Sequence, residues 1–407
     1  MFTYQFKLNP SKETQDLLWR HANRLNFLYN YFLNQRIQNY KEHKENPSVK
    51  LISKYDQIKE ITLLKTQEEF KDLKEIYSQN IQVVPDRLNK SYDNFFRRYK
   101  KGLLSGFPKF RSCRKFFGIL YPQSGYKIKG NVFETKIYGK IEFIKYREIK
   151  GNILQVYISN KNNTFYINII TDYNYPKNST SNIFLGIDVG IKNLVVGKDS
   201  NGSKIIIKNA THTKYFNKQI DKLKSRRDKL PKKEDKTKSR EYKRLNKVIQ
   251  KLSDVENRKT KDFQHKVSKK LSSQYDTIFV ENINIKKMSE SDKTSLNKYV
   301  RYTKLGQFLR YLEYKTFRVI KVNPFNTSKT CNKCGYIHKD LKLSDRYIKC
   351  VCGHEYDRDE NASANIYCLG QAILNGCTVD TNINKLISAG SPSLKGGVVH
   401  TTKIVKT

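Results

Sequence analysis

The chain has 407 residues, with 79 Lys and Arg against 38 Asp and Glu, which gives a formal net charge of +41 at pH 7. Its length suits two or three domains, and the lack of any apolar run near the ~18 residues of a membrane span, or of a secretory segment at the start, predicts a cytoplasmic protein. The positive charge is spread over the whole chain, which indicates a polyanionic partner such as nucleic acid but also fits a ribosomal or histone-like protein without enzymatic chemistry.

The N-terminal part of the sequence predicts one strand and then helices. Residues 2–8 alternate between apolar and polar side chains, as in a short strand. Ser11 is placed as the N-cap of the following helix, in which Leu18, Leu25 and Phe32 recur at helical spacing. We interpret the aromatic residues of this helix as core, because an apolar stripe at this period usually packs against a partner element.

A second helical stretch, residues 84–102, interleaves aromatic rings with basic residues, among them Arg97, Arg98, Lys100 and Lys101. This pattern fits a solvated basic face and a nucleic-acid contact equally well. From about residue 116 to 174 the period changes to two, with Gly and Asn turn signals between the segments. That change predicts a small antiparallel sheet or barrel.

Two apolar strands and one helix start, all after residue 181, carry an acid. Residues 182–209 predict three consecutive strands, the first of which ends in Asp188. After a basic helical region, a fourth strand ends in Glu281, and Asp359 stands at the head of the last long helix. A strand-end turn would also explain Asp188, but a buried carboxylate is costly unless it is paired or binds a metal.

The order of these elements is three strands, helix, strand, helix, strand, helix, which matches the RNase H-like fold. Chemistry of that kind uses two Mg²⁺ ions about 4 Å apart, held by carboxylates, to hydrolyse a phosphodiester. Mg²⁺ prefers hard oxygen ligands, which acids supply. We therefore expect Asp188, Glu281 and Asp359 to form a catalytic Mg²⁺ site.

Four of the seven cysteines form two close pairs, which in a reducing compartment indicates metal binding rather than disulfides. Two residues separate Cys331 from Cys334, and one residue separates Cys350 from Cys352. We expect these four thiolates to hold a structural Zn²⁺, with His338 or His354 as substitute ligands. The other cysteines, which are isolated, are interpreted as packing residues or free thiols: Cys113, Cys368 and Cys377.

The start of the last long helix concentrates acids. Asp357 is predicted to be its N-cap, and Glu360, three residues later, would complete a capping box. Asn361 and Asn365 share a face one turn apart and are candidates to orient phosphate or water. Arg358 fits a phosphate contact and a solvated arginine equally well.

Several of these motifs resemble the TnpB family of transposon-encoded RNA-guided DNA endonucleases, which are related to compact type V CRISPR effectors. The motifs are "LGIDVGIKNL", "VEN", "SKTCNKCG", "CGHEYDRDENASANI" and, upstream, "FFRRYKKG" and "GFPKFRS". The resemblance extends from residue 1 to about residue 370. The chain departs from the family pattern in its shortened second cysteine pair, in Ser363, where the family often has Ala, and in the sequence after about residue 376.

The resemblance implies a multidomain α+β architecture with five parts. These are a wedge β-barrel (1–10 and 116–175), a helical recognition domain (11–115), a split RuvC nuclease domain (182–326 and 355–375), a zinc ribbon (327–354) and a mobile C-terminal tail (376–407). Nucleic-acid contacts are expected from the basic residues of the motifs: Arg97, Arg98, Lys100, Lys101, Lys109 and Arg358.

The resemblance also implies function. The expected partners of this nucleoid-associated protein are a guide RNA and a double-stranded DNA target that is cut beside a short flanking motif, with neither a membrane nor a small-molecule substrate. Two alternatives remain, a type V CRISPR effector and a nuclease-inactive RNA-guided repressor. The presence of all three acids argues against the repressor. The older label "transposase" has less mechanistic support, because nothing in the sequence indicates strand transfer.

Overall fold

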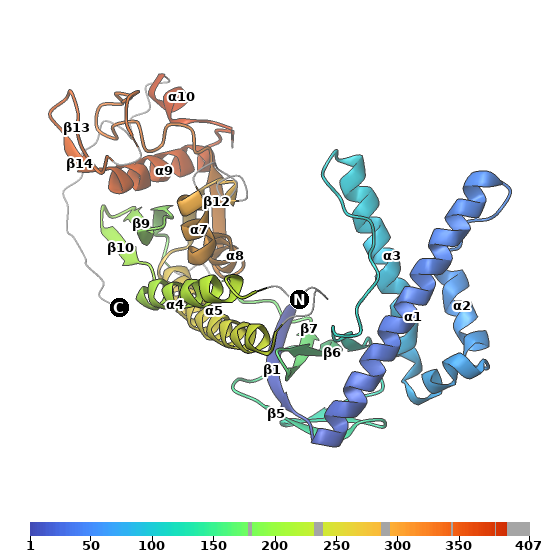
Figure 1. Cartoon of the computed structure of the whole chain (residues 1–407). Coiled ribbons are helices and arrows are strands. Elements are labelled where there is room, and N and C mark those ends of the chain that lie inside the picture. The colour runs from blue at the N-terminus through green and yellow to red at the C-terminus, as the bar shows by residue number, and fades with distance from the viewer. Residues whose placement is uncertain (178–180, 232–238, 286–293, 343–344, 379, 389–407) are drawn as a thin grey trace. The chain divides into compact units, whose positions relative to one another are not determined.

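The structure, a computed structural model, describes residues 1–177, 181–231, 239–285, 294–342, 345–378 and 380–388 (Figure 1). The chain forms two compact units, Met1–Asn174 and Tyr175–Thr407, each with its own β-sheet. Both units combine helices with strands, so the fold is multidomain and mixed α+β. Among the described helices, none combines the length and the hydrophobicity that crossing a membrane requires.

The first unit contains a seven-stranded antiparallel sheet of order β2-β6-β7-β1-β5-β4-β3. The N-terminal strand lies between β7 and β5, so segments far apart in the sequence share one sheet. Asn162 and Asn163 connect β6 to β7 with φ angles of 50° and 59°, as a tight hairpin turn requires. The strands are β1 (Phe2–Asn9), β2 (Ile119–Tyr121), β3 (Lys127–Lys129), β4 (Val132–Thr135), β5 (Gly139–Ile144), β6 (Ile153–Lys161) and β7 (Thr164–Thr171).

This sheet is open, which corrects the expectation of a closed barrel. Strands β2 and β3 form its two opposite edges within the fully described range 1–174. Each has only three residues, which leaves few backbone groups for closure. The sheet is therefore a half-barrel.

The helices of the first unit pack on this sheet. Ser11 is the N-cap of α1, as predicted, and accepts a hydrogen bond from the backbone N–H of Thr14. Leu18, Leu25 and Phe32 are fully buried, in one core with sheet residues such as Phe6. The helical elements are α1 (Lys12–Glu45), α2 (Lys54–Leu64), the 3₁₀ helix η1 (Glu68–Glu75) and α3 (Ser78–Lys100).

The second unit contains a five-stranded sheet of order β10-β9-β8-β11-β12. Strands β8, β9 and β10 form an antiparallel meander, whereas β11 pairs in parallel with both β8 and β12. This confirms the predicted order of strands and helices. The strands are β8 (Phe184–Asp188), β9 (Asn193–Asp199), β10 (Lys204–Lys208), β11 (Thr277–Glu281) and β12 (Arg318–Val322).

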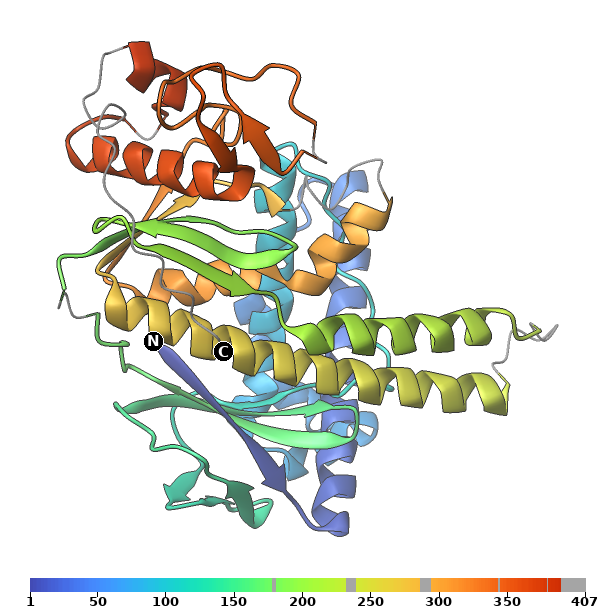
Figure 2. The ribbon, with the colours of Figure 1, turned by 90° about the vertical axis from the view of Figure 1, so that its left-hand side faces the viewer.

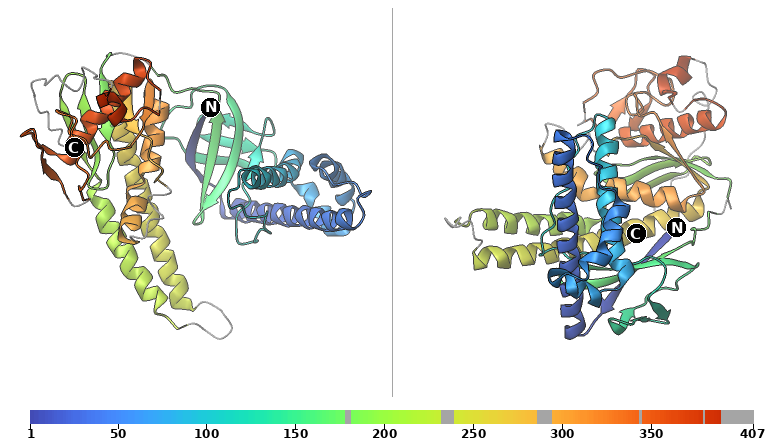
Figure 3. Two further views of the ribbon diagram at one scale, coloured as in Figure 1. Left: turned by 90° about the horizontal axis from the view of Figure 1, so that it is seen from above. Right: turned by 90° about the vertical axis from the view of Figure 1, so that its right-hand side faces the viewer.

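Helices cover both faces of the second sheet, as Figure 2 shows. Side chains alternate along β8 and β11: Leu185 and Ile278 pack with α5 and α8 on one face, whereas Phe279 packs with α9 on the other. Helices α4 and α5 form a hairpin that extends beyond the sheet (Figure 3). The helices are α4 (Thr211–Asp228), α5 (Arg240–Gln274), α7 (Thr294–Thr303), α8 (Leu305–Lys315), α9 (Arg358–Leu374) and α10 (Ile383–Ser388).

Two further features follow strand β12. A small antiparallel hairpin, β13 (Tyr347–Lys349) and β14 (Glu355–Asp357), leads directly into α9. Near the C-terminus, Ile383 and Leu386 of α10 are buried in the core that contains α9. The expectation of a mobile tail is therefore wrong for α10, because its apolar residues have a surface to pack on. Residues 389–407 lie outside the described part of the chain.

Candidate active site and metal centre

Three acids come from three elements of the second unit. Asp188 is the last residue of β8, Glu281 is the last residue of β11, and Asp359 is the second residue of α9. Strands β8 and β11 are parallel neighbours, with Ile187 opposite Val280, so Asp188 and Glu281 leave the sheet side by side at the same edge. The charge of Asp359 also acts on Asp188, so the structure brings together residues that are 171 positions apart in the sequence.

Gly186 allows α9 to approach β8 closely. A Cβ atom on this glycine would lie 2.6 Å from the backbone oxygen of Ser363 and 2.6 Å from the backbone nitrogen of Tyr367. Any larger residue would push the helix away from the sheet. The absence of a side chain at Gly186 thus lets α9 pack closely on β8, and the first turn of this helix carries Asp359.

The three carboxylates interact electrostatically. Burial, and then the negative charges of Glu281 and Asp359, raise the pKa of Asp188 to about 8. Burial also raises the pKa of Glu281, although the hydroxyl of Thr327 donates a hydrogen bond to its carboxylate and opposes the shift. Acids that repel one another in a buried place are suited to a multivalent cation, which compensates their charge.

Two arginines lie beside these acids. Arg346 Nη1 is 3.0 Å from each carboxylate oxygen of Asp359, and Arg358 Nε is 3.9 Å from one of them. Both positive charges lower the pKa of Asp188. The side chain of Arg358 is only 15% exposed, and it also donates a hydrogen bond to the backbone oxygen of Lys342. Arg358 is therefore not the solvated arginine of one interpretation, and its proposed phosphate contact stays a prediction.

The sequence analysis did not identify Arg346 or Thr327 as site residues. Thr327 follows β12, and Arg346 lies just before β13, between the two cysteine pairs. Each reaches the site only because the cysteine-bearing segment, residues 327–354, contacts α9. No spacing or periodicity in the sequence signals that contact.

The N-terminus of α9 confirms one prediction and corrects another. The Asp357 carboxylate accepts hydrogen bonds from the backbone N–H groups of Asp359, at 2.9 Å, and Glu360, at 3.2 Å, so Asp357 is the N-cap. Glu360 does not complete a capping box in the described structure. Its carboxylate forms an ion pair with Lys204 of β10, because that strand lies within reach of the helix.

Asn361 and Asn365 are buried and bind protein backbone rather than facing a ligand. Asn361 donates to Thr330 O at 2.6 Å and accepts from Asn332 N at 2.8 Å. Asn365 donates to Thr327 O at 2.8 Å and to Thr330 O at 2.7 Å. The expected role in orienting phosphate or water is therefore wrong for their amide donors, which fix the segment that leads to the first cysteine pair.

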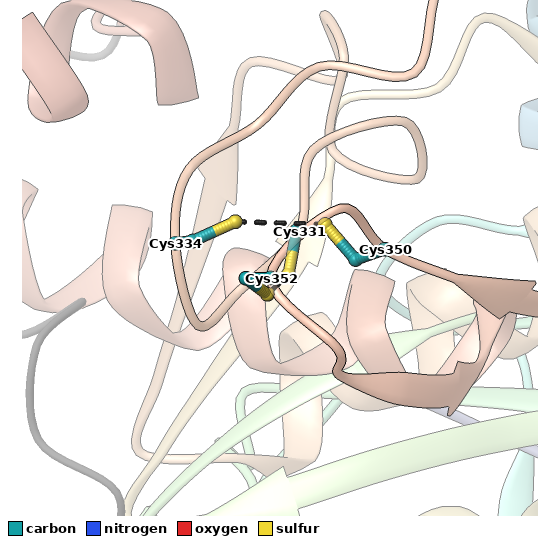
Figure 4. Close-up of side chains that lie close together, drawn as sticks. All are labelled: Cys331, Cys334, Cys350 and Cys352. Atoms are coloured by element: carbon teal, nitrogen blue, oxygen red, sulfur yellow. Dashed lines mark hydrogen bonds between the residues drawn. The ribbon is translucent and has the colours of Figure 1, made fainter.

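The four paired cysteines converge, as Figure 4 shows. The sulfur atoms of Cys331, Cys334, Cys350 and Cys352 all lie within 4.8 Å of one another. Gly335 and Gly353, each directly after the second cysteine of a pair, have φ angles of 80° and 76° that let the chain turn around the cluster.

Thiolates are the donors that zinc prefers, and four of them suit a closed, tetrahedral structural site. One member is predisposed to ionise, because the backbone N–H of His354 lowers the pKa of Cys352 to about 7. Neither His338 nor His354 belongs to the cluster within the described residues. The cluster therefore offers four cysteines, and neither histidine is needed to complete a set of four donors.

The predicted nucleic-acid contacts lie in different units. Five of them, Arg97, Arg98, Lys100, Lys101 and Lys109, belong to the end of α3 and the segment after it, whereas Arg358 is in the second unit. Residues 94–115 hold eight Lys and Arg and no acid. Aromatic rings accompany this charge: Phe95 contacts both Tyr99 and Phe107, and Tyr99 is 70% exposed.

Three family models match the chain in sequence order. A model described as "Helix-turn-helix domain" matches residues 1–45, "Probable transposase" matches residues 159–292, and "Cas12f1-like, TNB domain" matches residues 306–366. The first two models represent OrfB proteins of IS605-type elements. In the first range the structure has strand β1 and the single helix α1 rather than two helices.

Curated relatives match over long stretches. The chain is 26% identical to "Putative RNA-guided DNA endonuclease InsQ" of Escherichia coli (strain K12), over 91% of this chain and 92% of the relative. It is 23% identical to a "Putative RNA-guided DNA endonuclease" of Streptomyces pristinaespiralis, over 77% and 76% of the two chains. It is 26% identical to "TnpB-like protein L770" of Acanthamoeba polyphaga mimivirus, over 69% of this chain and 55% of the relative.

One solved structure shares the fold over most of the chain. It is titled "Cryo-EM structure of the Cas12f1-sgRNA-target DNA complex", and the match has a TM-score of 0.54 at 16% identity. The match covers 87% of this chain and 83% of that protein. A match of this extent includes parts of both units.

Proposed function

Because the chain belongs to the TnpB/OrfB family of IS605-type elements, we propose that it is an RNA-guided, metal-dependent DNA endonuclease of an insertion-sequence transposon. It would cleave its target beside a short flanking motif. The observation that carries the proposal is the convergence of Asp188, Glu281 and Asp359 from two adjacent strand ends and one helix start. Relatives that bear the name of RNA-guided endonucleases support the substrate class.

We assign the second unit to an RNase H-like (RuvC) nuclease domain, split into residues 182–326 and 355–375 by a zinc ribbon at residues 327–354. The strand order, with an antiparallel meander followed by two parallel strands, supports this assignment. In the first unit, residues 1–10 and 116–175 would be the wedge domain and residues 11–115 the recognition domain. The fold shared with Cas12f1 supports this division.

The three acids would hold Mg²⁺ through hard carboxylate oxygens. When bound, the metal would activate a water molecule and stabilise the leaving oxygen of the phosphodiester. Thr327 holds the Glu281 carboxylate by its hydrogen bond, which restricts the rotamers of that side chain. Arg346 and Arg358 supply positive charge beside Asp359, where an anionic substrate would otherwise meet only acids.

A guide RNA and double-stranded DNA would be the partners. In such complexes base pairing carries the sequence specificity, while the protein reads the backbone and a short flanking motif. The net charge of +41 suits this backbone contact. The predicted contacts at Arg97, Arg98, Lys100, Lys101, Lys109 and Arg358 belong to this proposal.

A type V CRISPR effector is the second candidate, favoured by the fold shared with Cas12f1. Only the genetic neighbourhood, a transposon end or a repeat array, separates the two. A nuclease-inactive repressor is less favoured, because Asp188, Glu281 and Asp359 are all present.

The proposal is tested by purifying the protein with its co-purifying RNA and sequencing that RNA. The complex should cut a matching duplex only with divalent metal, and ribonuclease or a chelator should abolish cutting. The Asp188→Asn variant serves as the matched control, which should bind RNA and DNA without cutting. Sequence-specific cutting by RNA-free protein, or unchanged cutting by Asp188→Asn, would refute the proposal.

A further inference from the structure

Arg87 of α3 is half-buried, and no acidic side chain of the fully described first unit pairs with it. Arg24 and Arg36 of α1 are comparably buried, and each has polar partners: Arg24 pairs with Asp72 at 2.6 Å, and Arg36 donates to Gln57 at 3.0 Å. Within the fully described first unit, the Arg87 guanidinium has neither an ion pair nor a hydrogen bond. Its neighbour Asp86 is engaged by Lys54 at 3.1 Å.

A second arginine lies beside it. The guanidinium carbons of Arg87 and Arg111 are 4.4 Å and 4.7 Å from the centroid of the same ring, Phe117. Asn26 and Asn30 fix Arg111: the Asn26 side chain accepts from Arg111 Nε at 2.9 Å, and the Asn30 side chain accepts from its backbone N–H at 2.7 Å. The second guanidinium is therefore held in position by neutral groups, which leave its charge uncompensated.

Two like charges in a half-buried place are unfavourable. Burial, and then the charge of Arg111, lower the pKa of Arg87 to about 10. A Cβ on Gly118 would lie 3.2 Å from the backbone oxygen of Ile158 and 3.9 Å from Arg87 Nη2, so the backbone at Gly118 approaches the guanidinium with no side chain between them. An anion with two acceptor oxygens would compensate both charges and match the planar fork of a guanidinium.

We propose that Arg87 and Arg111 form a preorganised binding site for one phosphodiester group of a bound nucleic-acid strand, where α3 meets the sheet. Arg87 precedes the segment 94–115, with its eight cations and no acid, and Arg111 belongs to it, which makes nucleic acid the complementary ligand. The site lies in the unit without the carboxylates and rests only on the nucleic-acid-binding part of the proposed function.

The test measures binding of the full-length protein to an RNA and a DNA oligonucleotide of one sequence, in EDTA so that no cleavage occurs. The logarithm of the binding constant falls with the logarithm of salt concentration by roughly 0.9 per neutralised phosphate on a DNA duplex and by roughly 0.7 on a single strand. In Arg87→Gln and in Arg111→Gln the slope should decrease by about one for the oligonucleotide, RNA or DNA, that occupies the site. The double variant should lose no more than either single variant, because both residues bind one phosphate.

Lys90→Gln is the matched control, since Lys90 is an exposed cation on the same helix. Thermal unfolding without nucleic acid separates binding from folding: Arg87→Gln should leave the midpoint unchanged or raise it, because it removes a charge repulsion. A smaller salt dependence of binding in the arginine variants, with RNA, with DNA or with both, supports the site and shows which kind of strand occupies it. Slopes in both arginine variants that change no more than in Lys90→Gln overturn it.

Discussion

Arg346 Nη1 lies 3.0 Å from both carboxylate oxygens of Asp359, and this contact joins the cysteine-bearing segment to the proposed catalytic acids. Arg346 is 40% exposed, whereas Asp359 is only 17% exposed. The charge of Arg346 also reaches Asp188, whose pKa it lowers. The four-cysteine cluster therefore contributes to the acid site through the position of one arginine.

Replacing Arg346 by glutamine should move the pH dependence of cleavage. Without this cation the pKa of Asp188 rises further, so protons compete with metal up to a higher pH. At subsaturating Mg²⁺ the acidic limb of the pH–rate profile should shift to higher pH, and Arg346→Lys should restore part of the shift. Zinc content should stay unchanged. A profile of Arg346→Gln that superimposes on the wild type would contradict this role.

The raised pKa of Asp188 predicts a stability effect in metal-free protein. Below about pH 4 the carboxyl is protonated in both the folded and the unfolded chain, so it has no effect. Between the ordinary value of 3.8 and about 8, the unfolded chain is ionised and the folded chain is not, so stability decreases as pH rises. Above about 8 the penalty is constant.

Asp188→Asn should therefore raise the melting temperature of metal-free protein, and by more at pH 8 than at pH 5. Differential scanning calorimetry in EDTA measures this difference. Adding Mg²⁺ should stabilise the wild type more than the variant, since ligand that binds only the folded state adds to its stability. A lower melting temperature of Asp188→Asn at pH 8 in EDTA would show that the Asp188 carboxyl group does not destabilise the folded chain.

Removing a zinc ligand should disturb the acids at a distance. Cys331→Ser leaves three thiolates, so zinc content by mass spectrometry should fall, and Arg346 and Thr327 should lose their fixed positions. Cleavage should then decrease although every acid is intact. Cys113→Ser is the control, because Cys113 is exposed and lies in the first unit. Carefully prepared wild-type protein with less than one zinc per chain would count against the cluster as a zinc site.

Gly186→Ala should reduce cleavage without touching any proposed ligand. The added methyl would meet α9 backbone atoms at 2.6 Å, so the helix must shift and carry Asp359 away from Asp188. A displacement of about 1 Å can lower a rate by roughly 100-fold. RNA binding, which does not depend on this spacing, should be retained. Wild-type single-turnover rates in this variant would show that α9 need not lie so close.

The sheet that carries the acids was predictable, because each of its strands shows a local signal. The apolar run before Glu281 and the three strands around Asp188 reflect burial on both faces of the sheet, which is a property of the sequence itself. The N-cap role of Asp357 is equally local, since the backbone groups it satisfies are two and three residues away.

The parts that were missed depend on contacts between distant segments. Glu360 had the spacing of a capping box, but its carboxylate forms an ion pair with Lys204, 156 positions earlier. Asn361 and Asn365 point to backbone oxygens of a loop whose path no sequence pattern predicts. Ile383 and Leu386 are too few to signal a packed helix until the core around α9 is known.

Two aspartates separated by one residue should differ in function. The Asp357 carboxylate is turned to the backbone of α9, where it accepts two N–H groups, whereas Asp359 interacts with Asp188 and with Arg346. Asp359→Ala should abolish Mg²⁺-dependent cleavage and leave RNA and target binding nearly unchanged, because metal acts on the chemical step. Asp357→Ala should cost about 1 kcal/mol of stability, as the loss of a helix cap does, and retain measurable turnover.

Single-turnover cleavage by the two variants, with thermal unfolding in parallel, decides between the roles. Asp357→Asn is the matched control, because asparagine is an equally good N-cap but carries no charge. If Asp357 only caps the helix, the asparagine variant should cleave and melt like the wild type. If Asp357 also binds metal, both of its variants should be inactive, as inactive as Asp359→Ala. Full activity of Asp359→Ala would remove the nuclease assignment from this site, since the helix would then supply no ligand that the reaction needs.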